Sequence, residues 1–405
     1  MTSDDRGDRR RLGAVVLAVL ISQVLLYPGV PALVVELGAP AGIDAGMWFL
    51  VAEFTAFVTF AVVWGVASDA LGRRVPLIVA GALGGAASYV ALAVVPGLGL
   101  GFSTVLLVRV VGGSLTIGAF SLAITTLMDL GGGNGRNMGA AGLAIGLGAA
   151  VGSVVGGALA DVGPFYPVYA GAVVLAGAGL LATTVDDRGP DGSGEPAPTM
   201  AGVIARVRGT PGLLVPFAFG FVDRLTAGFF ALVGVYYFQD PATFGLSATG
   251  AGATLALFFV PFALLQSPFG SLSDRIGRFV PVVFGSIAYG VVTIGVGLAP
   301  IYAVAAGSMV LVGVCGALMA PATMALVTDL VDPTARGAAM GAFNVFGSLG
   351  FLTGFLVGGG VTGTFGYRAA FLAVGGLELA IALALLPAVR VVAPRVGTSP
   401  SVGGD

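Results

Sequence analysis

Long stretches of apolar residues, separated by short polar breaks, dominate the sequence. Only 9% of the residues are charged, against about 25% in an ordinary soluble domain, and the mean hydropathy is +1.02. So few charges cannot cover a surface that faces water, which excludes soluble globular, disordered and fibrous proteins. The unbroken runs also exclude a transmembrane barrel, whose strands are alternating segments of about 10 residues. A polytopic helical membrane protein remains.

The apolar stretches predict an all-α membrane protein with twelve transmembrane helices, because a spanning helix needs about 20 apolar residues. The first stretch is longer than the apolar core of a signal peptide, so we expect it to be a retained helix. The predicted spans are 12–34, 46–67, 75–95, 102–127, 138–160, 165–185, 212–237, 248–269, 279–299, 301–327, 338–361 and 367–389.

The one long polar break divides the twelve spans into two sets of six. Its first part is rich in Gly, Pro and acidic residues, which indicates a flexible linker; residues 199–208 fit either a short interfacial helix or a plain loop. The predicted organisation is an N-terminal segment 1–11, a six-helix bundle 12–185, a linker 186–211, a second six-helix bundle 212–389 and a tail 390–405. We expect the tail to be disordered from Val391 onward.

The arginines predict the orientation in the membrane. All 18 basic residues are Arg, and an N-terminus inside the cell places fifteen of them on the cytoplasmic side. Arg368 alone lies outside in that orientation, and Arg109 and Arg224 lie within helices. Cytoplasmic loops of membrane proteins carry an excess of basic residues, so we expect a multi-pass cell-membrane protein with both termini and the linker in the cytoplasm.

The rarer residues exclude several classes of function. The chain has no His, which is the usual metal ligand and proton relay near neutral pH, and its single cysteine, Cys315, can form no intrachain disulfide. No lysine-containing phosphate-binding loop exists, and a net charge of −2 provides no basic stripe for nucleic acid. We therefore expect no metal, no cofactor, no nucleic-acid partner and no enzymatic activity.

The two sets of six spans repeat each other. The segment from Gly65 to Arg74 recurs as Gly270 to Arg278 at an offset of 205 residues. Two further patterns recur in the same order: Asp129 and Arg136 as Asp329 and Arg336, and the glycines 139, 148, 152, 156 and 157 as the glycines 341, 350, 354, 358 and 359. Parallel repeats of this kind predict two bundles related by a pseudo-twofold axis along the membrane normal.

The repeated junction motif carries a family resemblance. Over residues 12–390 the chain resembles the major facilitator superfamily, whose best-known mark is G-x-x-x-D-R-x-G-R-R between the second and third helices. The first copy departs from it at Ala70, where Arg is usual, and the fourth span has the family's Arg-x-x-x-Gly pattern at Arg109 and Gly113. The matching residues are Gly65, Asp69, Gly72, Arg73 and Arg74 in the first copy and Gly270, Asp274, Arg275, Gly277 and Arg278 in the second.

The resemblance implies a gate at these junctions. We expect Asp69 to lie near the N-terminus of the eleventh span, around residues 337–340, where the helix dipole favours an anion. We expect Arg73 to reach Asp129 at the end of the fourth span. The second copy is expected to repeat this arrangement against the fifth span through Asp274, Arg278 and Asp329. In the family these contacts lock the cytoplasmic face when the transporter opens outward; the alternative is that the arginines only set the topology and bind anionic lipid.

Ionisable residues inside spans are the candidates for function, because a charge near the bilayer centre costs at least about 2.5–3.5 kcal/mol. Glu53 and Arg109 lie at equal depth, roughly 10 Å from the outer ends of the second and fourth spans at 1.5 Å per residue. We expect them to form an ion pair. The pair is either structural or linked to proton transport, and the sequence leaves both interpretations open.

A second set of ionisable residues lies near the midplane of the other bundle. Asp223 and Arg224 are adjacent on the seventh span and point about 100° apart, so we expect one of them to face a central cavity for substrate or protons. A structural bond between Arg224 and Glu378 of the last span would leave Asp223 to that cavity or to the interface between the bundles. The other polar candidates are Gln23, Tyr27, Tyr236, Tyr237, Gln266 and Asn344.

The glycines of the fifth span bear on the substrate. They resemble the antiporter motif of drug exporters, although Ser153 stands where a helix-kinking Pro is usual. The segment Tyr27-Pro28-Gly29-Val30-Pro31 also resembles twelve-span drug exporters. The favoured interpretation is a monomeric secondary transporter that works by alternating access and exports small amphipathic or apolar compounds in exchange for protons. The alternative is an importer or uniporter of a small metabolite on the same fold, and a receptor without transport would need neither cavity nor motif.

Overall fold

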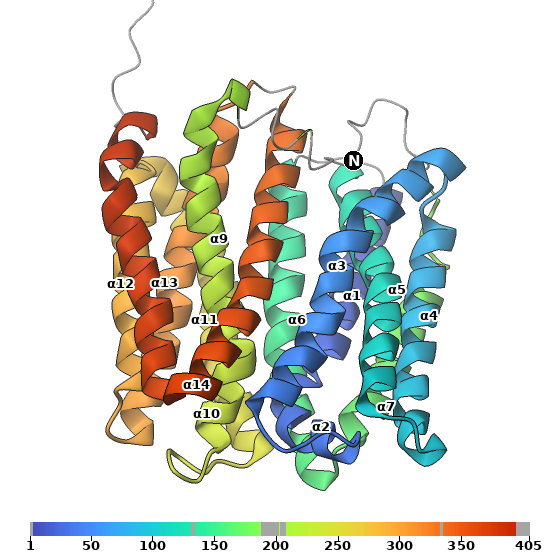
Figure 1. Cartoon of the computed structure of the whole chain (residues 1–405). Coiled ribbons are helices and arrows are strands. Elements are labelled where there is room, and N and C mark those ends of the chain that lie inside the picture. The colour runs from blue at the N-terminus through green and yellow to red at the C-terminus, as the bar shows by residue number, and fades with distance from the viewer. Residues whose placement is uncertain (1–2, 131–133, 188–201, 203–207, 333–334, 394–405) are drawn as a thin grey trace, which may run out of the picture.

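A computed structural model of the chain describes residues 3–130, 134–187, 202, 208–332 and 335–393. Within these ranges all regular structure is helical (Figure 1), as the apolar runs predict. Most of the predicted linker 186–211 lies outside the described residues, as do the end of the tail and the choice between helix and loop at 199–208. Arg136, Arg188, Arg206 and Arg395 also carry side chains outside the described part.

The first half of the chain, up to residue 187, folds into seven α-helices and two short 3-10 turns. Its elements are α1 (Ser3–Val24), η1 (Tyr27–Gly29), α2 (Val30–Glu36), α3 (Ile43–Leu71), α4 (Val75–Val94), η2 (Val95–Leu98), α5 (Phe102–Asp129), α6 (Asn134–Val162) and α7 (Tyr166–Ala182). The first predicted span is thus divided at Tyr27–Gly29, where Pro28 has no backbone N–H to continue the helix.

The second half contains a further set of helices. Its elements are η3 (Pro211–Leu213), α9 (Leu214–Phe229), the π-helical turn η4 (Phe230–Gly234), α10 (Val235–Gln239), α11 (Ala248–Ile276), α12 (Phe279–Gly297), α13 (Tyr302–Asp329) and α14 (Arg336–Val392). The seventh predicted span is therefore one continuous helical path from α9 to α10 with a π-turn inside it, and π-turns within helices are frequent at functional sites.

Helix α14 corresponds to two predicted spans. It is 57 residues long and is interrupted at Gly366, whose φ of 82° and ψ of 174° are not helical. Only glycine adopts such angles without strain, so the chain reverses there and the second limb returns beside α12 (Figure 1). The limbs 336–365 and 367–392 coincide with the predicted spans 338–361 and 367–389.

In the described part of the chain, ten helical segments are long and apolar enough to cross a membrane, and α7 is a shorter apolar helix. With α14 counted as two limbs, these segments match the predicted spans one for one. The chain is therefore a multi-pass membrane protein. The number of times that it crosses the bilayer stays a prediction, because length and composition alone identify the spans.

The helices form two bundles, one from each half of the sequence (Figure 1). The bundles meet along α6 and α11 on one side and along α3 and the first limb of α14 on the other. We call the surface that carries the two motif junctions, with Arg73, Arg74, Arg275 and Arg278, the arginine face. The surface that carries the turns 37–42 and 240–247 is called the opposite face.

The repeated glycines set the distance between neighbouring helices. A Cβ atom at Gly152 or Gly156 of α6 would lie 2.9 or 2.2 Å from a backbone carbonyl oxygen of α1 or of the residue that follows it. At the equivalent Gly350 and Gly354 of α14 it would lie 2.0 or 2.2 Å from a carbonyl oxygen of α9. Such contacts are possible only between bare backbones, and small residues are the usual means of close helix packing in membranes. The repeat seen in the sequence is thus a repeat of packing.

We predict that Gly156→Ala destabilises the protein and that Gly139→Ala does not. The methyl group at position 156 would overlap the carbonyl oxygen of Leu25, so α1 and α6 must separate, whereas nothing lies within 4 Å of a Cβ at position 139. Overpacking of this kind costs about 1–3 kcal/mol. Apparent melting temperatures of the purified variants in detergent test this, and equal values for both variants would contradict the packing argument.

Candidate functional site

The first motif copy forms the junction between α3 and α4. Gly72 ends α3 in the left-handed conformation, with a φ of 62°. The guanidinium of Arg74, only 8% exposed, donates a hydrogen bond to the Asp129 carboxylate at the end of α5. The prediction that Arg73 makes this contact is wrong. The side chain of Arg73 is 74% exposed and lies 4.0 Å from the carboxylate of Asp187.

Asp187 explains why the two arginines take different roles. Its carboxylate accepts hydrogen bonds from the backbone N–H groups of Arg74 and Val75 at 3.0 and 3.1 Å, and so caps the first turn of α4. This position draws Arg73 outward toward the same carboxylate. Arg74 is left to turn inward toward α5 and Asp129.

The second motif copy forms the junction between α11 and α12. There the predicted contact of Arg278 with Asp329 is confirmed, whereas Asp274 pairs with Arg278 and makes no bond to the fifth span within the described residues. Arg278 donates hydrogen bonds to Asp274 at 2.6 Å and to Asp329 at 3.1 Å. Burial lowers the pKa of Arg278, but the bonds to these two carboxylates outweigh it and raise the pKa above its ordinary value. At the repeat offset of 205, Arg278 is the counterpart of Arg73, so the two copies use arginines one position apart for the same contact.

Asp69 does not make its predicted contact in this conformation. Its side chain is exposed and makes no hydrogen bond or ion pair with the described residues, those of 337–340 included. In Figure 1, α3 and the first limb of α14 lie close toward the opposite face and diverge toward the arginine face. The contact that the family resemblance implies is therefore open here.

At the opposite face the two bundles are joined by hydrogen bonds to backbone groups. Asp161, near the end of α6, accepts from the N–H groups of Ala248 and Thr249 at 2.9 and 3.0 Å, at the N-terminus of α11. A carboxylate is favourable there because the free N–H groups and the helix dipole both attract an anion. Ser247, the N-cap residue of α11, accepts from the N–H of Gly250 and completes the cap.

Two side chains of α10 add to this closure. Gln239 donates to the carbonyl of Pro28 at 2.8 Å, and Tyr236 donates to the carbonyl of Gly42 at 3.1 Å. Both bonds reach from the second half of the chain to the first. Tyr236, one of the polar candidates, therefore makes a structural contact at the interface between the bundles.

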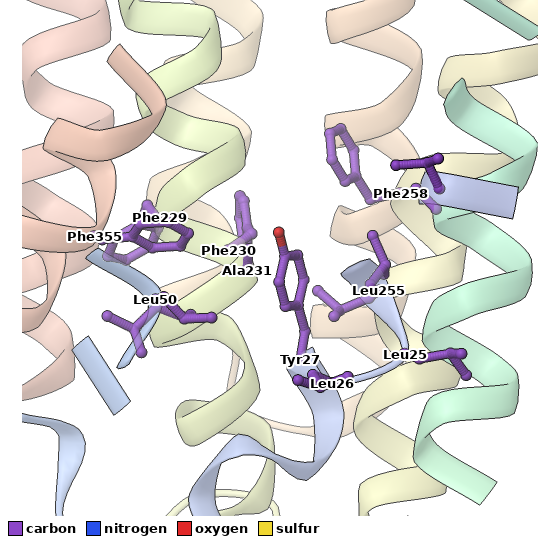
Figure 2. Packing of buried hydrophobic residues seen from close by; sticks show 14 of the residues in the cluster. Leu25, Leu26, Tyr27, Leu50, Phe229, Phe230, Ala231, Leu255, Phe258 and Phe355 are labelled. Carbon is purple, nitrogen blue, oxygen red and sulfur yellow. The ribbon is translucent and has the colours of Figure 1, made fainter. Parts of the chain in front are cut away.

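Aromatic rings extend the contact between the bundles inward from the opposite face. Phe54 of α3 stacks on Phe351 at 4.5 Å between ring centroids and meets Phe355 edge-on at 5.3 Å. Tyr27 and Phe230 belong to the same buried cluster, which draws residues from both halves of the chain (Figure 2). The aromatic residues of the seventh span are thus mostly packed inside the protein rather than against lipid.

Glu53 of α3 and Arg109 of α5 form the ion pair that the sequence predicts. They are 2% and 5% exposed, and the Arg109 guanidinium lies 4.3 Å from the centroid of the Phe49 ring. Gly113, one turn after Arg109, lets the backbones of α3 and α5 approach, since its Cβ would lie 2.7 Å from the carbonyl oxygen of Glu53. The Nε atom of Arg109 has no partner among the described residues.

Asp223 and Arg224 point to different neighbours of α9. Asp223 is 7% exposed and faces α13, where a Cβ at Gly316 would lie 3.9 Å from its carboxylate. Arg224 packs on the first limb of α14, where a Cβ at Gly347 would lie 3.2 Å from its Cγ. The acid therefore faces the interior of the second bundle, and the arginine faces a helix at the boundary between the bundles.

The bond between Arg224 and Glu378 that would leave Asp223 to the cavity or to the interface between the bundles is not formed in the described conformation. Glu378, on the second limb of α14, instead accepts hydrogen bonds from the hydroxyls of Ser286 and Thr226. Nothing in the sequence singles out these hydroxyls, because Ser and Thr within apolar helices usually bond to their own backbone. Burial and the position of the last helix reveal their role.

The sequence matches a known family of membrane transporters over most of its length. The family model of the Major Facilitator Superfamily matches residues 12–242 and 220–403. The chain belongs to the Major Facilitator Superfamily. It is therefore a membrane transporter of small molecules and not an enzyme, as the motif pair and the apolar spans predict.

Individual relatives agree with the family. The chain is 29% identical to the class G tetracycline resistance protein of Vibrio anguillarum over 347 residues, which cover 82% of this chain and 84% of that protein. It is also 29% identical to the multidrug efflux pump LfrA of Mycolicibacterium smegmatis over 151 residues, 37% of this chain and 28% of that protein. The fold resembles the crystal structure of the nucleoside transporter NupG, with a TM-score of 0.74, 15% identity and coverage of 95% of this chain and 99% of that one.

We predict that Arg74→Gln lowers stability more than Arg73→Gln. The first change removes a partly buried hydrogen bond between charged groups, worth up to about 1.5–3 kcal/mol, whereas the second removes an exposed pair worth about 0–1 kcal/mol. Chemical unfolding of the two purified variants in detergent measures the difference. A larger loss for Arg73→Gln would mean that Arg73 is the residue that holds Asp129.

Proposed function

We propose that the protein exports small amphipathic or apolar compounds in exchange for protons. The observation that carries this proposal is the buried pair of Glu53 and Arg109, in a chain that has no His to carry a proton. The similarity to a tetracycline resistance protein and a multidrug efflux pump supports export. The likeness in fold to a nucleoside transporter shows only that the same fold also serves carriers of other small molecules. The alternative is therefore kept: an importer or uniporter of a small metabolite.

The Glu53–Arg109 pair provides a means of coupling. A carboxylate buried beside an arginine is stable as an ion, but one left alone in an apolar interior is stable only with a proton bound. A movement of α3 against α5 that separates the pair would therefore drive proton uptake at Glu53. Rejoining the pair would release the proton.

In alternating access a transporter is open to one side of the membrane at a time, so the described conformation is open either to the cytoplasm or to the outside. The positive-inside rule places the arginine face in the cytoplasm. Since the bundles are bonded to each other at the opposite face by Asp161, Gln239 and Tyr236, we assign the structure to the inward-facing state of a cell-membrane transporter. The unpartnered Asp69 supports this, because its contact with the eleventh span belongs to the outward-facing state.

The residues between the bundles support an amphipathic or apolar substrate. The boundary there is largely aromatic and aliphatic, with Phe54, Phe351 and Phe355 among its members. Arg224 is the one described arginine within helix α9, and no arginine cluster lies beside it on that helix to bind a phosphate group. We therefore favour uncharged or weakly charged organic compounds over organic phosphates.

Two neutral variants test the coupling. Glu53→Gln and Asp223→Asn are reconstituted into proteoliposomes and compared for substrate accumulation driven by a proton gradient and for substrate exchange without one. We expect Glu53→Gln to lose accumulation and keep exchange, because the side chain can no longer bind and release a proton. Glu36→Gln is the matched control, since Glu36 is exposed at the end of α2.

The same assay separates the alternatives. If both Glu53→Gln and Asp223→Asn still accumulate substrate against its gradient, these acids are structural and the coupling proposal fails. Facilitated transport by the wild-type protein that does not respond to a proton gradient would favour the uniporter.

Orientation is tested with two single cysteines in a Cys315→Ser background. Ala70 lies on the arginine face and Ala242 on the opposite face, and neither is buried. An impermeant maleimide added to intact cells should label Ala242→Cys and leave Ala70→Cys unlabelled until the membrane is permeabilised. The reverse pattern would invert the proposed topology.

A further inference from the structure

Glu378 is a fully buried acid with hydroxyl partners only. It lies on the second limb of α14 with an exposed fraction of 0%, and the close approach of α12 at Gly290 covers it. Ser286 of α12 donates to one of its carboxyl oxygens, and Thr226 of α9 donates to the other at 3.3 Å. Within the described residues no arginine forms an ion pair with it.

A second acid lies beside this site. Asp223 precedes Thr226 by three residues on α9, so the two side chains share one face of that helix, and Thr226 is the residue that bonds to Glu378. Asp223 is 7% exposed and also has no ion pair with the described residues. Two acids thus share one apolar bundle without a bonded cation.

Tyr289 supplies an independent sign that something else binds here. Its side chain is 0% exposed, it lies one turn after Ser286 on the same face of α12, and its hydroxyl has no hydrogen-bond partner among the described residues. A buried hydroxyl without a partner is costly. A water molecule bound beside the acids would satisfy the Tyr289 hydroxyl and would complete a site for a proton.

Arg224 is the only basic residue of α9, α12 and α13, which pack around these acids. The titratable residues near the site are Asp223 of α9, Tyr289 of α12, one turn after Ser286, and Cys315 of α13, which adjoins the Gly316 that lies next to Asp223. Arg224 follows Asp223 in the sequence, but its side chain packs on the first limb of α14 at Gly347 and forms no ion pair with the acid within the described residues. An ionised carboxylate in such surroundings is strongly disfavoured, and ionisable groups inside membrane proteins mark proton pathways.

We propose that Glu378 and Asp223 form a proton-binding site inside the second bundle, separate from the Glu53–Arg109 pair, in which Glu378 holds a proton in the described conformation. Asp223 is the less buried of the two and is the group through which the proton enters and leaves. In that step a carboxyl oxygen of Glu378 gives up the proton and a carboxylate oxygen of Asp223 accepts it, with Thr226 between them. The coupling role of this site rests on the proposed proton exchange.

Infrared spectroscopy of the purified wild-type transporter in lipid tests the site without transport. A protonated buried carboxyl gives a carboxylic acid C=O band, and we expect Glu378→Gln to remove one component of it. Ser286→Ala keeps the acid but removes a hydrogen bond, so it should retain that component at a shifted frequency and serves as a second variant if Glu378→Gln folds poorly. Spectra in which neither variant alters the band would overturn the proposal.

Transport measurements test the coupling role of Glu378. Glu378→Gln keeps the shape and polarity of the side chain, so gradient-free exchange should persist. Accumulation driven by protons should fall by roughly 5-fold or more, the lower end of typical coupling between two ligands. Loss of the infrared component with unchanged driven accumulation would show a permanently protonated, structural Glu378 and would overturn the coupling role.

The two proposals fail separately. If the wild-type protein shows no proton-driven transport, the proposed function is wrong, and the infrared band still decides whether Glu378 binds a proton. If the wild-type protein is proton-driven and Glu378→Gln matches it in both assays, the second proton site is wrong and the proposed function stands.

Discussion

Close contact between bare helix backbones is the constraint on which the rest of the structure depends. The hydrophobic effect does not hold helices together inside lipid, so packing at small residues has to do so. Gly152 and Gly156 bring α6 onto α1, and Gly350 and Gly354 bring α14 onto α9. One residue beyond the first set, a Cβ at Gly157 would lie 2.3 Å from the carbonyl oxygen of Ala248 in the other bundle. The same helix thus fixes the shape of its own bundle and contacts the other, which suits a rigid-body movement of two halves.

The duplication preserved this packing while the charges diverged. At the offset of 205 the counterpart of Glu53 is Phe258, so the second bundle has no copy of the Glu53–Arg109 pair. That bundle instead buries Glu378 among hydroxyls. Packing between backbones depends on small residues at fixed positions. A buried charge needs only a partner within reach, so during evolution a buried charge can change its helix more easily than a packing glycine can.

The sequence predicts the helices and the two bundles of this protein well, but it predicts only some of the contacts between individual side chains. Apolar runs and the repeat identify the segments and the two bundles, and equal depth identifies the partners Glu53 and Arg109, because both signals depend only on distance along a helix. Contacts in loops depend on the turn and on remote residues. Asp187, from beyond the last helix of the first bundle, decides that Arg74 and not Arg73 reaches Asp129, and the single state described leaves Asp69 without its expected contact.

The balance between the two faces explains how such a transporter can change state. Within the described residues, four hydrogen bonds join the bundles at the opposite face: Asp161 accepts two, and Tyr236 and Gln239 donate one each. Each contributes about 0.5–1.5 kcal/mol net. A contact between Asp69 and the N-terminus of the eleventh span would return about 0.3–2 kcal/mol at the other face. Both sets are small and both end on backbone groups, so these polar contacts alone favour neither state by more than a few kcal/mol. A proton or a substrate that binds one state better is then sufficient to shift the population.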